Sequence, residues 1–190
     1  MRILGIDPGS VATGFGVVEG RGARVAHVAH GTLRPPRSAE LPERLAFLHR
    51  AVAALLAAHR PDAIAIERVF AGRSVHAALV LGQARGAVLA ALAVAAVPIR
   101  ELAPQHVKLA VTGQGAAEKA QVQAMVRRLL ALDALPPRDA ADALAAAICC
   151  AQEGRLAVLA ASRSSARTPA RDLSGLRGAR RSRLVVRRVP

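Results

Sequence analysis

The sequence predicts an α/β fold with a five-stranded mixed sheet, three antiparallel strands plus two parallel ones, flanked by helices. Three observations support this class. The chain opens on three strand-like runs separated by short turns, as in an antiparallel meander. Two later apolar runs, 62–67 and 98–102, each follow a helical stretch, and a strand in that position is expected to lie parallel in the sheet. The 190 residues are enough for one such domain and a tail.

The first strand is a short apolar run, residues 3–6, that ends on Asp7 and a Pro-Gly turn. An apolar run of this length, bounded by turn residues, is typical of a buried strand. Residues 13–19 and 24–33 have the composition of the next two strands, with a hairpin turn at 20–22. A carboxylate that leaves the core on a central strand is costly to desolvate, so we expect Asp7 to have charged companions.

Residues 62–67 repeat the pattern of the first strand, because a short apolar run again ends on an acid, Glu67. If the two strands are neighbours, Asp7 and Glu67 leave the sheet at the same carboxyl edge, where ligands of α/β sheets bind. Taken alone, Glu67 is also explained as an exposed strand-end acid paired with Arg68. The predicted helices cover 41–59, 74–97, 104–111, 119–132 and a last stretch that begins after Pro136-Pro137.

The last predicted helix carries Asp139 and Asp142, and a spacing of three places both carboxylates on one face, about a turn apart. Asp139 has a structural explanation, since acids near a helix N-terminus complement the helix dipole and cap free amides. Asp142 has no such explanation, because it precedes the apolar run 143–150 of a helix that must be buried. An unpaired carboxylate there would be destabilising, so we expect Asp142 to be a companion of Asp7.

The net charge of +14 is unevenly distributed, since residues 155–190 hold ten arginines and one aspartate, giving +9, against +5 in residues 1–154. A polyanion, nucleic acid first, is the expected partner; an arginine-rich composition from a biased genome is the alternative. With no Trp or Tyr and three Phe, base stacking along a single strand is excluded as the main binding mode. We expect a folded domain over 1–158 and a basic, mostly disordered tail over 159–190.

The two cysteines, Cys149 and Cys150, are adjacent in an apolar run, so they lack zinc-ligand spacing and are poorly placed to bridge each other. We interpret them as core residues of a reduced protein. The longest apolar run, 86–99, is shorter than the roughly 20 residues of a membrane span and is bracketed by arginines. We therefore expect a buried helix without a membrane anchor or signal peptide, and a cytoplasmic location.

Four carboxylates thus stand at two strand ends and at the start of the last helix: Asp7, Glu67, Asp139 and Asp142. Hard oxygen ligands of this kind suit Mg²⁺ or Mn²⁺. Without a cation, each carboxylate about 4 Å from a phosphodiester would repel it by about 4 kcal/mol at an effective dielectric of about 20. Two divalent ions would neutralise the cluster, and this arrangement indicates two-metal phosphodiester hydrolysis.

Several segments, in this order, resemble the RuvC family of bacterial crossover junction endodeoxyribonucleases, whose fold is ribonuclease H-like. They are spread over residues 3–148, and together they are far more specific than any one alone. The matching segments are 5–10 with Thr13-Gly14, 65–67 with Val69-Phe70, 81–86, 113–123 and 139–145.

The resemblance implies a homodimer that binds a four-way Holliday junction and makes two symmetric nicks, in DNA recombination and repair. A two-fold symmetric junction is best matched by a two-fold protein that presents two identical sites. The resemblance also implies two Mg²⁺ ions per active site, with Mn²⁺ as a substitute, and the branch-migration proteins RuvA and RuvB as partners.

The family's catalytic, metal-binding acids fall on the four carboxylates named above. Its two important basic residues fall on Lys108 and Lys119, the only lysines of the chain, where positive charge would hold phosphate near the scissile bond. Phe70 matches the family aromatic that wedges against bases at the crossover. A core position is the alternative for Phe70.

Two other functions are compatible with parts of the sequence. An ATP-using sugar-kinase or actin-like fold also opens with a strand, Asp, Gly and Ser or Thr, but the chain is too short for its nucleotide-binding half. A non-catalytic junction-binding or architectural protein would need only the positive charge, and its acids would be incidental. Loss of cleavage with retained binding, when Asp7 is changed to Asn, separates a nuclease from such a protein.

Overall fold

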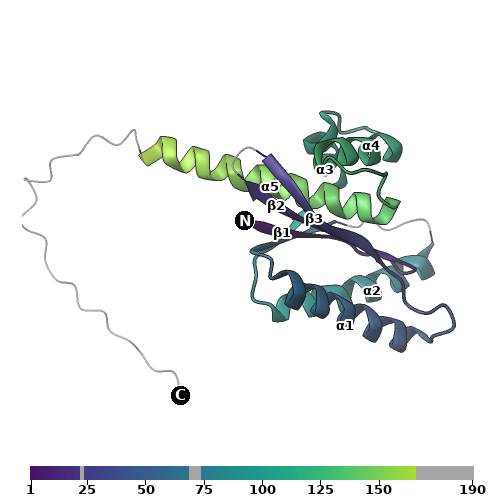
Figure 1. The fold of residues 1–190 in the computed structure, drawn as a ribbon. Helices are drawn as coiled ribbons and strands as arrows, with labels where there is room; N and C mark the ends of the chain where they lie inside the picture. Colours follow the sequence, from purple (N-terminus) through teal and green to yellow (C-terminus); the bar gives the residue numbers. More distant parts are fainter. Residues whose placement is uncertain (22–23, 69–73, 166–190) are drawn as a thin grey trace, which may run out of the picture.

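The computed structural model describes residues 1–21, 24–68 and 74–165, and Figure 1 shows how their helices and strands are arranged. The strands are β1 (Arg2–Asp7), β2 (Thr13–Arg21), β3 (Arg24–Leu33), β4 (Ala63–Glu67) and β5 (Ile99–Leu102). The helices are α1 (Leu41–His59), α2 (Val75–Val94), α3 (Pro104–Thr112), α4 (Lys119–Leu129) and α5 (Arg138–Ser165).

The strands form one sheet in the order β3-β2-β1-β4-β5. β1, β2 and β3 pair antiparallel, whereas β4 lies parallel to β1 and β5 lies parallel to β4. The predicted mixed sheet is therefore confirmed. Ile6 pairs with Ile66 across β1 and β4, so Asp7 and Glu67 are the next residues to leave the sheet, side by side.

Helices cover both faces of the sheet, with α1 and α2 on one face and α3, α4 and α5 on the other (Figure 1). The alternation of side chains along β1 divides the core accordingly. Leu4 and Ile6 pack with α1 and α2, while Ile3 packs with α5 and with apolar residues of α3 and α4. Cys149 and Cys150 lie buried and unbridged in the second of these layers, as predicted for core residues.

Glycines let α5 approach the backbone of the sheet. A Cβ on Gly14 of β2 would overlap the carbonyl oxygen of Asp139, and one on Gly5 of β1 would overlap that of Ala143. Neither glycine has a positive φ, so the requirement is for space and not for an unusual backbone conformation. The close approach places the first turns of α5 over the last part of β1 and the start of β2, where Asp7 pairs with Gly14.

The prediction that the apolar run 86–99 forms a buried helix is wrong in part. Among the described residues, α2 is the helix that is long and apolar enough to cross a membrane, judged by length and composition alone. It contributes Ala84, Val88 and Leu92 to the core beneath the sheet, which accounts for part of its apolar character. Its opposite face is exposed, however, and includes Val75, Leu79 and Val94.

The predicted domain boundary stays a prediction. α5 continues past residue 158 to Ser165, and residues 166–190 lie outside the described residues.

Candidate active site

Asp7 and Glu67 end two neighbouring parallel strands, because Ile6 and Ile66, the residues before them, are paired in β1 and β4. Both acids are partly buried at the carboxyl edge of the sheet. The prediction that the two strands are neighbours is therefore confirmed. Parallel pairing brings together two carboxylates that are sixty residues apart in the sequence.

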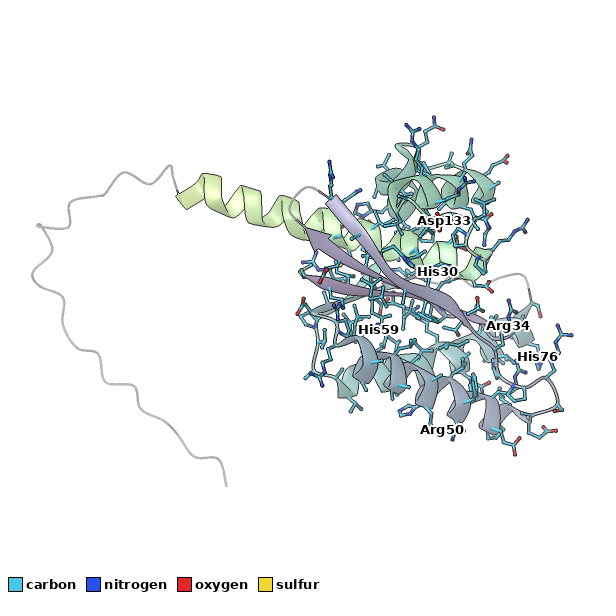
Figure 2. All side chains as sticks on the ribbon, viewed as in Figure 1. His30, Arg34, Arg50, His59, His76 and Asp133 are labelled. Carbon is cyan, nitrogen blue, oxygen red and sulfur yellow. The ribbon has the colours of Figure 1, made fainter. Side chains whose placement is uncertain are left out.

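The first turns of α5 supply the other two acids, and each has a basic partner. Lys119, the first residue of α4, places its Nζ 3.3 Å from Oδ2 of Asp142. Arg34, which follows the last residue of β3, places Nη2 3.5 Å from Oδ2 of Asp139. Figure 2 shows Arg34 at the end of the sheet where α5 begins. Both acids are thus partly neutralised by cations from distant segments.

Two cavities share Glu67 and bring together the four predicted acids and both lysines. The larger, of about 620 Å³, is lined by Asp7, Glu67, Asp139 and Arg34, together with the loop that follows β1. The smaller, of about 50 Å³, is lined by Glu67 and Asp142 and by the two lysines, Lys108 and Lys119. Phe70, the other predicted site residue, lies outside the described residues.

Burial and mutual repulsion disfavour the ionised form of the two strand-end acids. Burial first, and then the charges of Glu67 and Asp142, raise the pKa of Asp7 from 3.8 to about 7. The pKa of Glu67 is also raised, first by burial and then by Asp142. Lys119 lowers the pKa of both acids, and Lys108 lowers that of Glu67, without cancelling the shifts. The surroundings of both acids therefore favour their neutral forms.

The donor set fits hard divalent cations. All four candidate ligands are carboxylates, which Mg²⁺ and Mn²⁺ prefer, and a bound cation would favour the ionised form of Asp7 that its surroundings disfavour. Among the described residues, a different group has three potential metal-ligand atoms that all lie within 4.8 Å of one another. It consists of His106, Cys149 and Glu153. The four acids are spaced more widely, as expected of carboxylates that repel one another and are drawn to separate basic partners.

Arg85 is a further residue of the site to which the sequence assigned no role. Its side chain on α2 donates from Nη1 to the backbone carbonyl of Glu67 at 2.7 Å, and its Nη2 lies 2.9 Å from Oε2 of Glu101. This largely buried guanidinium links the end of β4 to α2 and β5. We infer that Arg85 helps to position Glu67. Its place in the 81–86 motif was the available signal, but the motif does not reveal which backbone group it contacts.

The raised pKa of Asp7 predicts a pH-dependent stability in the absence of metal. Between its ordinary value of 3.8 and about 7, folded Asp7 keeps a proton that the unfolded chain has released. Its stabilising contribution is therefore complete below the lower value and is lost as the pH rises through the upper one. We expect Asp7→Asn to gain about 2–4 kcal/mol in unfolding free energy relative to the wild type by about pH 8.

Urea unfolding of both proteins in a chelating buffer, at several values between about pH 4 and pH 8, measures this difference. A difference that does not change with pH would show that Asp7 titrates normally. Addition of Mg²⁺ at the higher pH should reduce the advantage of the variant, because the cation favours ionised Asp7.

Acids that end two neighbouring parallel strands, together with acids in the first turns of a helix packed on the sheet, supply the ligand type of a divalent-cation site on an α/β fold of the ribonuclease H-like class. Comparison with known proteins gives the particular family. The profile described as "Crossover junction endodeoxyribonuclease RuvC" matches residues 3–150. The chain belongs to the RuvC family of crossover junction endodeoxyribonucleases, and the resemblance stated from the motifs is confirmed.

Individual relatives agree with this assignment. The chain is 55% identical over 148 residues to RuvC of Alkalilimnicola ehrlichii, covering 78% of this chain and 89% of that protein. It is similar to the structure of Thermus thermophilus RuvC, with 38% identity, a TM-score of 0.74, and coverage of 83% of this chain and 97% of that chain. T. thermophilus RuvC in complex with a Holliday junction substrate gives 35% identity, a TM-score of 0.74, and coverage of 82% and 96%.

Proposed function

We propose that this protein is a structure-selective endonuclease that resolves Holliday junctions by paired symmetric nicks, in DNA recombination and repair. Family membership and the junction complex of the T. thermophilus relative support this activity. The observation that carries the chemistry is the convergence of Asp7, Glu67, Asp139 and Asp142 around two adjoining cavities that also contain both lysines.

The four acids would hold two Mg²⁺ ions, with Mn²⁺ as a substitute. When bound, ions of this kind let an anionic phosphodiester enter an acidic site, and they favour attack by water and departure of the leaving oxygen. Asp7 would act in its ionised form, so the apparent affinity for the ions should rise as the pH rises through its pKa of about 7.

The basic residues would hold the phosphate. Lys119 and Arg34 neutralise Asp142 and Asp139 in this structure, and each carries a side chain with a large exposed fraction that is able to reorient. Once cations occupy the acids, we expect both groups to turn toward phosphate oxygens of the DNA. Lys108 lines the smaller cavity and would contact the same strand. We retain Phe70 as the proposed wedge at the crossover.

The exposed face of α2 supports the proposal that the protein is a homodimer. Val75 and Leu79 lie one turn apart on this face. The positions of Gly82 and Gly86 face open space, since no described atom of this chain lies within 4 Å of a Cβ placed at either glycine. A stripe of small and apolar residues permits close packing of a partner helix. A second copy is the occupant that best matches the two-fold symmetry of a junction.

We predict that Leu79→Glu converts the dimer to a monomer, because it would bury a charge at the centre of this face. The control is Leu109→Glu on α3, since Leu109 is 53% exposed and Leu79 is 63% exposed, but Leu109 lies outside the α2 face. Sedimentation or light scattering over a concentration series measures the oligomeric state. A monomeric wild type, or a variant with an unchanged dimer constant, would contradict the prediction.

The remaining proposals concern the chain as a whole. We propose a cytoplasmic location, with RuvA and RuvB as partners that deliver the junction. Residues 1–158 would form the nuclease domain, and the basic segment 159–190 would add sequence-independent contacts to DNA. The high positive charge of that segment supports this division, since such contacts depend on the number of phosphates neutralised.

The experiment that tests the proposed function compares three substrates, a synthetic four-way junction, a linear duplex and an RNA–DNA hybrid, in Mg²⁺ and in chelator. We expect paired nicks in the junction in Mg²⁺, little cleavage of the other two, and none in chelator. Equal cleavage of linear duplex would contradict junction selectivity. Junction binding without cleavage in Mg²⁺ or Mn²⁺ would indicate an architectural protein.

A further inference from the structure

A second group of metal-ligating side chains lies between α3 and α5. His106 comes from α3, and Cys149 and Glu153 come from successive turns of α5, four residues apart. One ligand atom from each residue lies within 4.8 Å of the other two. None of the three lines either active-site cavity, so the group is separate from the four acids.

We propose that His106, Cys149 and Glu153 bind a single Zn²⁺ ion. A thiolate sulfur, an imidazole nitrogen and a carboxylate oxygen are the ligand types of borderline-soft cations, whereas Mg²⁺ avoids sulfur. Three protein ligands leave a fourth position of a tetrahedral ion for water. No pattern along the chain indicates this site, because adjacent cysteines lack zinc-ligand spacing and the histidine is contributed by a different helix.

The surroundings of Glu153 already hold it in a ligating position. Its Oε1 lies 3.3 Å from Nε2 of His106, and its Oε2 lies 3.3 Å from Nη1 of Arg100. An ion that replaces the first contact leaves the second intact, so Arg100 would orient the carboxylate as an outer partner of the site. The His106 side chain is 51% exposed and that of Glu153 is 27% exposed, so the ion can enter from solvent. Cys149 is buried and would be the innermost ligand.

Binding replaces one contact and releases one proton. The His106–Glu153 contact is exchanged for two metal bonds, with neutral His106 carrying its proton on the ring nitrogen that does not bind zinc, and the Cys149 thiol loses its proton to solvent as the sulfur–zinc bond forms. Because the thiol must lose its proton, binding should strengthen as the pH rises. The bound ion would fasten α3 to α5 and so restrain the helix that carries Lys108.

Cobalt(II) in place of zinc tests the proposal, because only a thiolate ligand gives a sulfur-to-cobalt charge-transfer band. The full-length protein is titrated with Co²⁺ alone under reducing conditions. We expect one equivalent of cobalt to produce the band in the wild type and in Cys150→Ser, which retains Cys149. The band should be lost in Cys149→Ser. The acids of the nuclease site hold no sulfur, so their cobalt does not contribute to it.

Zinc added to the cobalt protein should remove the band, and His106→Ala and Glu153→Gln should each weaken cobalt binding by at least about tenfold. Circular dichroism of each variant checks that it is folded. No band in the wild type, or an equal band in Cys149→Ser, would overturn the proposal. The result is independent of the nuclease activity, since the readout is the cobalt spectrum of a protein without DNA.

Discussion

We expect replacement of Asp7 by Asn to abolish cleavage of a four-way junction in Mg²⁺ and to leave junction binding near the wild-type level. Asn has the shape of Asp, so the turn after β1 and its pairing with Gly14 are retained. It lacks the negative charge that a divalent cation requires, and Asp7 is the acid on which the charges of Glu67 and Asp142 converge. We expect the cleavage rate to fall by at least about 100-fold, the scale of removing one preorganised electrostatic group.

Single-turnover cleavage and a gel-shift titration in Ca²⁺ or chelator measure the two quantities separately. The matched control is Asp133→Asn, which removes a carboxylate of the same kind from an exposed position near α4 (Figure 2). We expect this control to cleave at the wild-type rate. Cleavage by Asp7→Asn within a few-fold of the wild type would remove Asp7 from the mechanism. Equal loss of binding and cleavage would instead indicate a structural role.

The same substitution should stabilise the metal-free fold, because the surroundings of Asp7 disfavour its ionised form. Loss of activity combined with a gain in stability is the signature of a group held in an unfavourable environment for its function. A variant that is inactive because it is misfolded would show the opposite combination, with both activity and stability reduced. The two measurements together therefore identify the cause of the loss.

The fold and the acids could be predicted because local patterns and one general rule determine them. Apolar runs that end on Asp7 and Glu67 are visible in the sequence, and the rule that a strand after a helix lies parallel brings their ends together. The spacing of Asp139 and Asp142 then follows from the helical repeat. Each of these predictions uses either residues that are close in the sequence or the expected order of the strands.

The basic partners could not be predicted in this way, because their contacts join segments with no local relation. Arg34 follows β3, the edge strand of the sheet, and contacts Asp139 on α5. Arg85 lies in the middle of α2 and contacts the carbonyl of Glu67. An isolated arginine in an arginine-rich chain gives no signal of its target. The group of His106, Cys149 and Glu153 was missed for the same reason.

The two small-residue patterns of the chain have different physical meanings. Gly82 and Gly86 lie four residues apart on α2, and no described atom of this chain lies within 4 Å of a Cβ placed at either position. Gly5 and Gly14, by contrast, are in close contact with the backbone of α5. Because α5 carries two of the four acids, the second pattern couples the packing of the core to the geometry of the site.

Gly14→Ala should therefore destabilise the protein by about 3 kcal/mol or more, toward the upper end of the cost of overpacking a core. The added Cβ would overlap the carbonyl oxygen of Asp139 and lie 3.0 Å from the amide nitrogen of Ala140. These are backbone atoms of a helix, so the clash cannot be relieved by rotation of a side chain. α5 must move away from the sheet, and Asp139 must move with it.

Urea unfolding followed by circular dichroism measures the loss, with Gly20→Ala as the control. Gly20 lies on the same strand, but among the described residues a Cβ there would meet only the carbonyl oxygen of Met1, at 3.6 Å, an ordinary contact. We expect the control to unfold with the wild-type midpoint and to cleave junctions normally. Gly14→Ala should also lose cleavage under conditions where it is fully folded, since displacement of α5 moves Asp139 and Asp142 relative to Asp7. A folded variant with wild-type stability and activity would show that α5 does not need this close approach to the sheet.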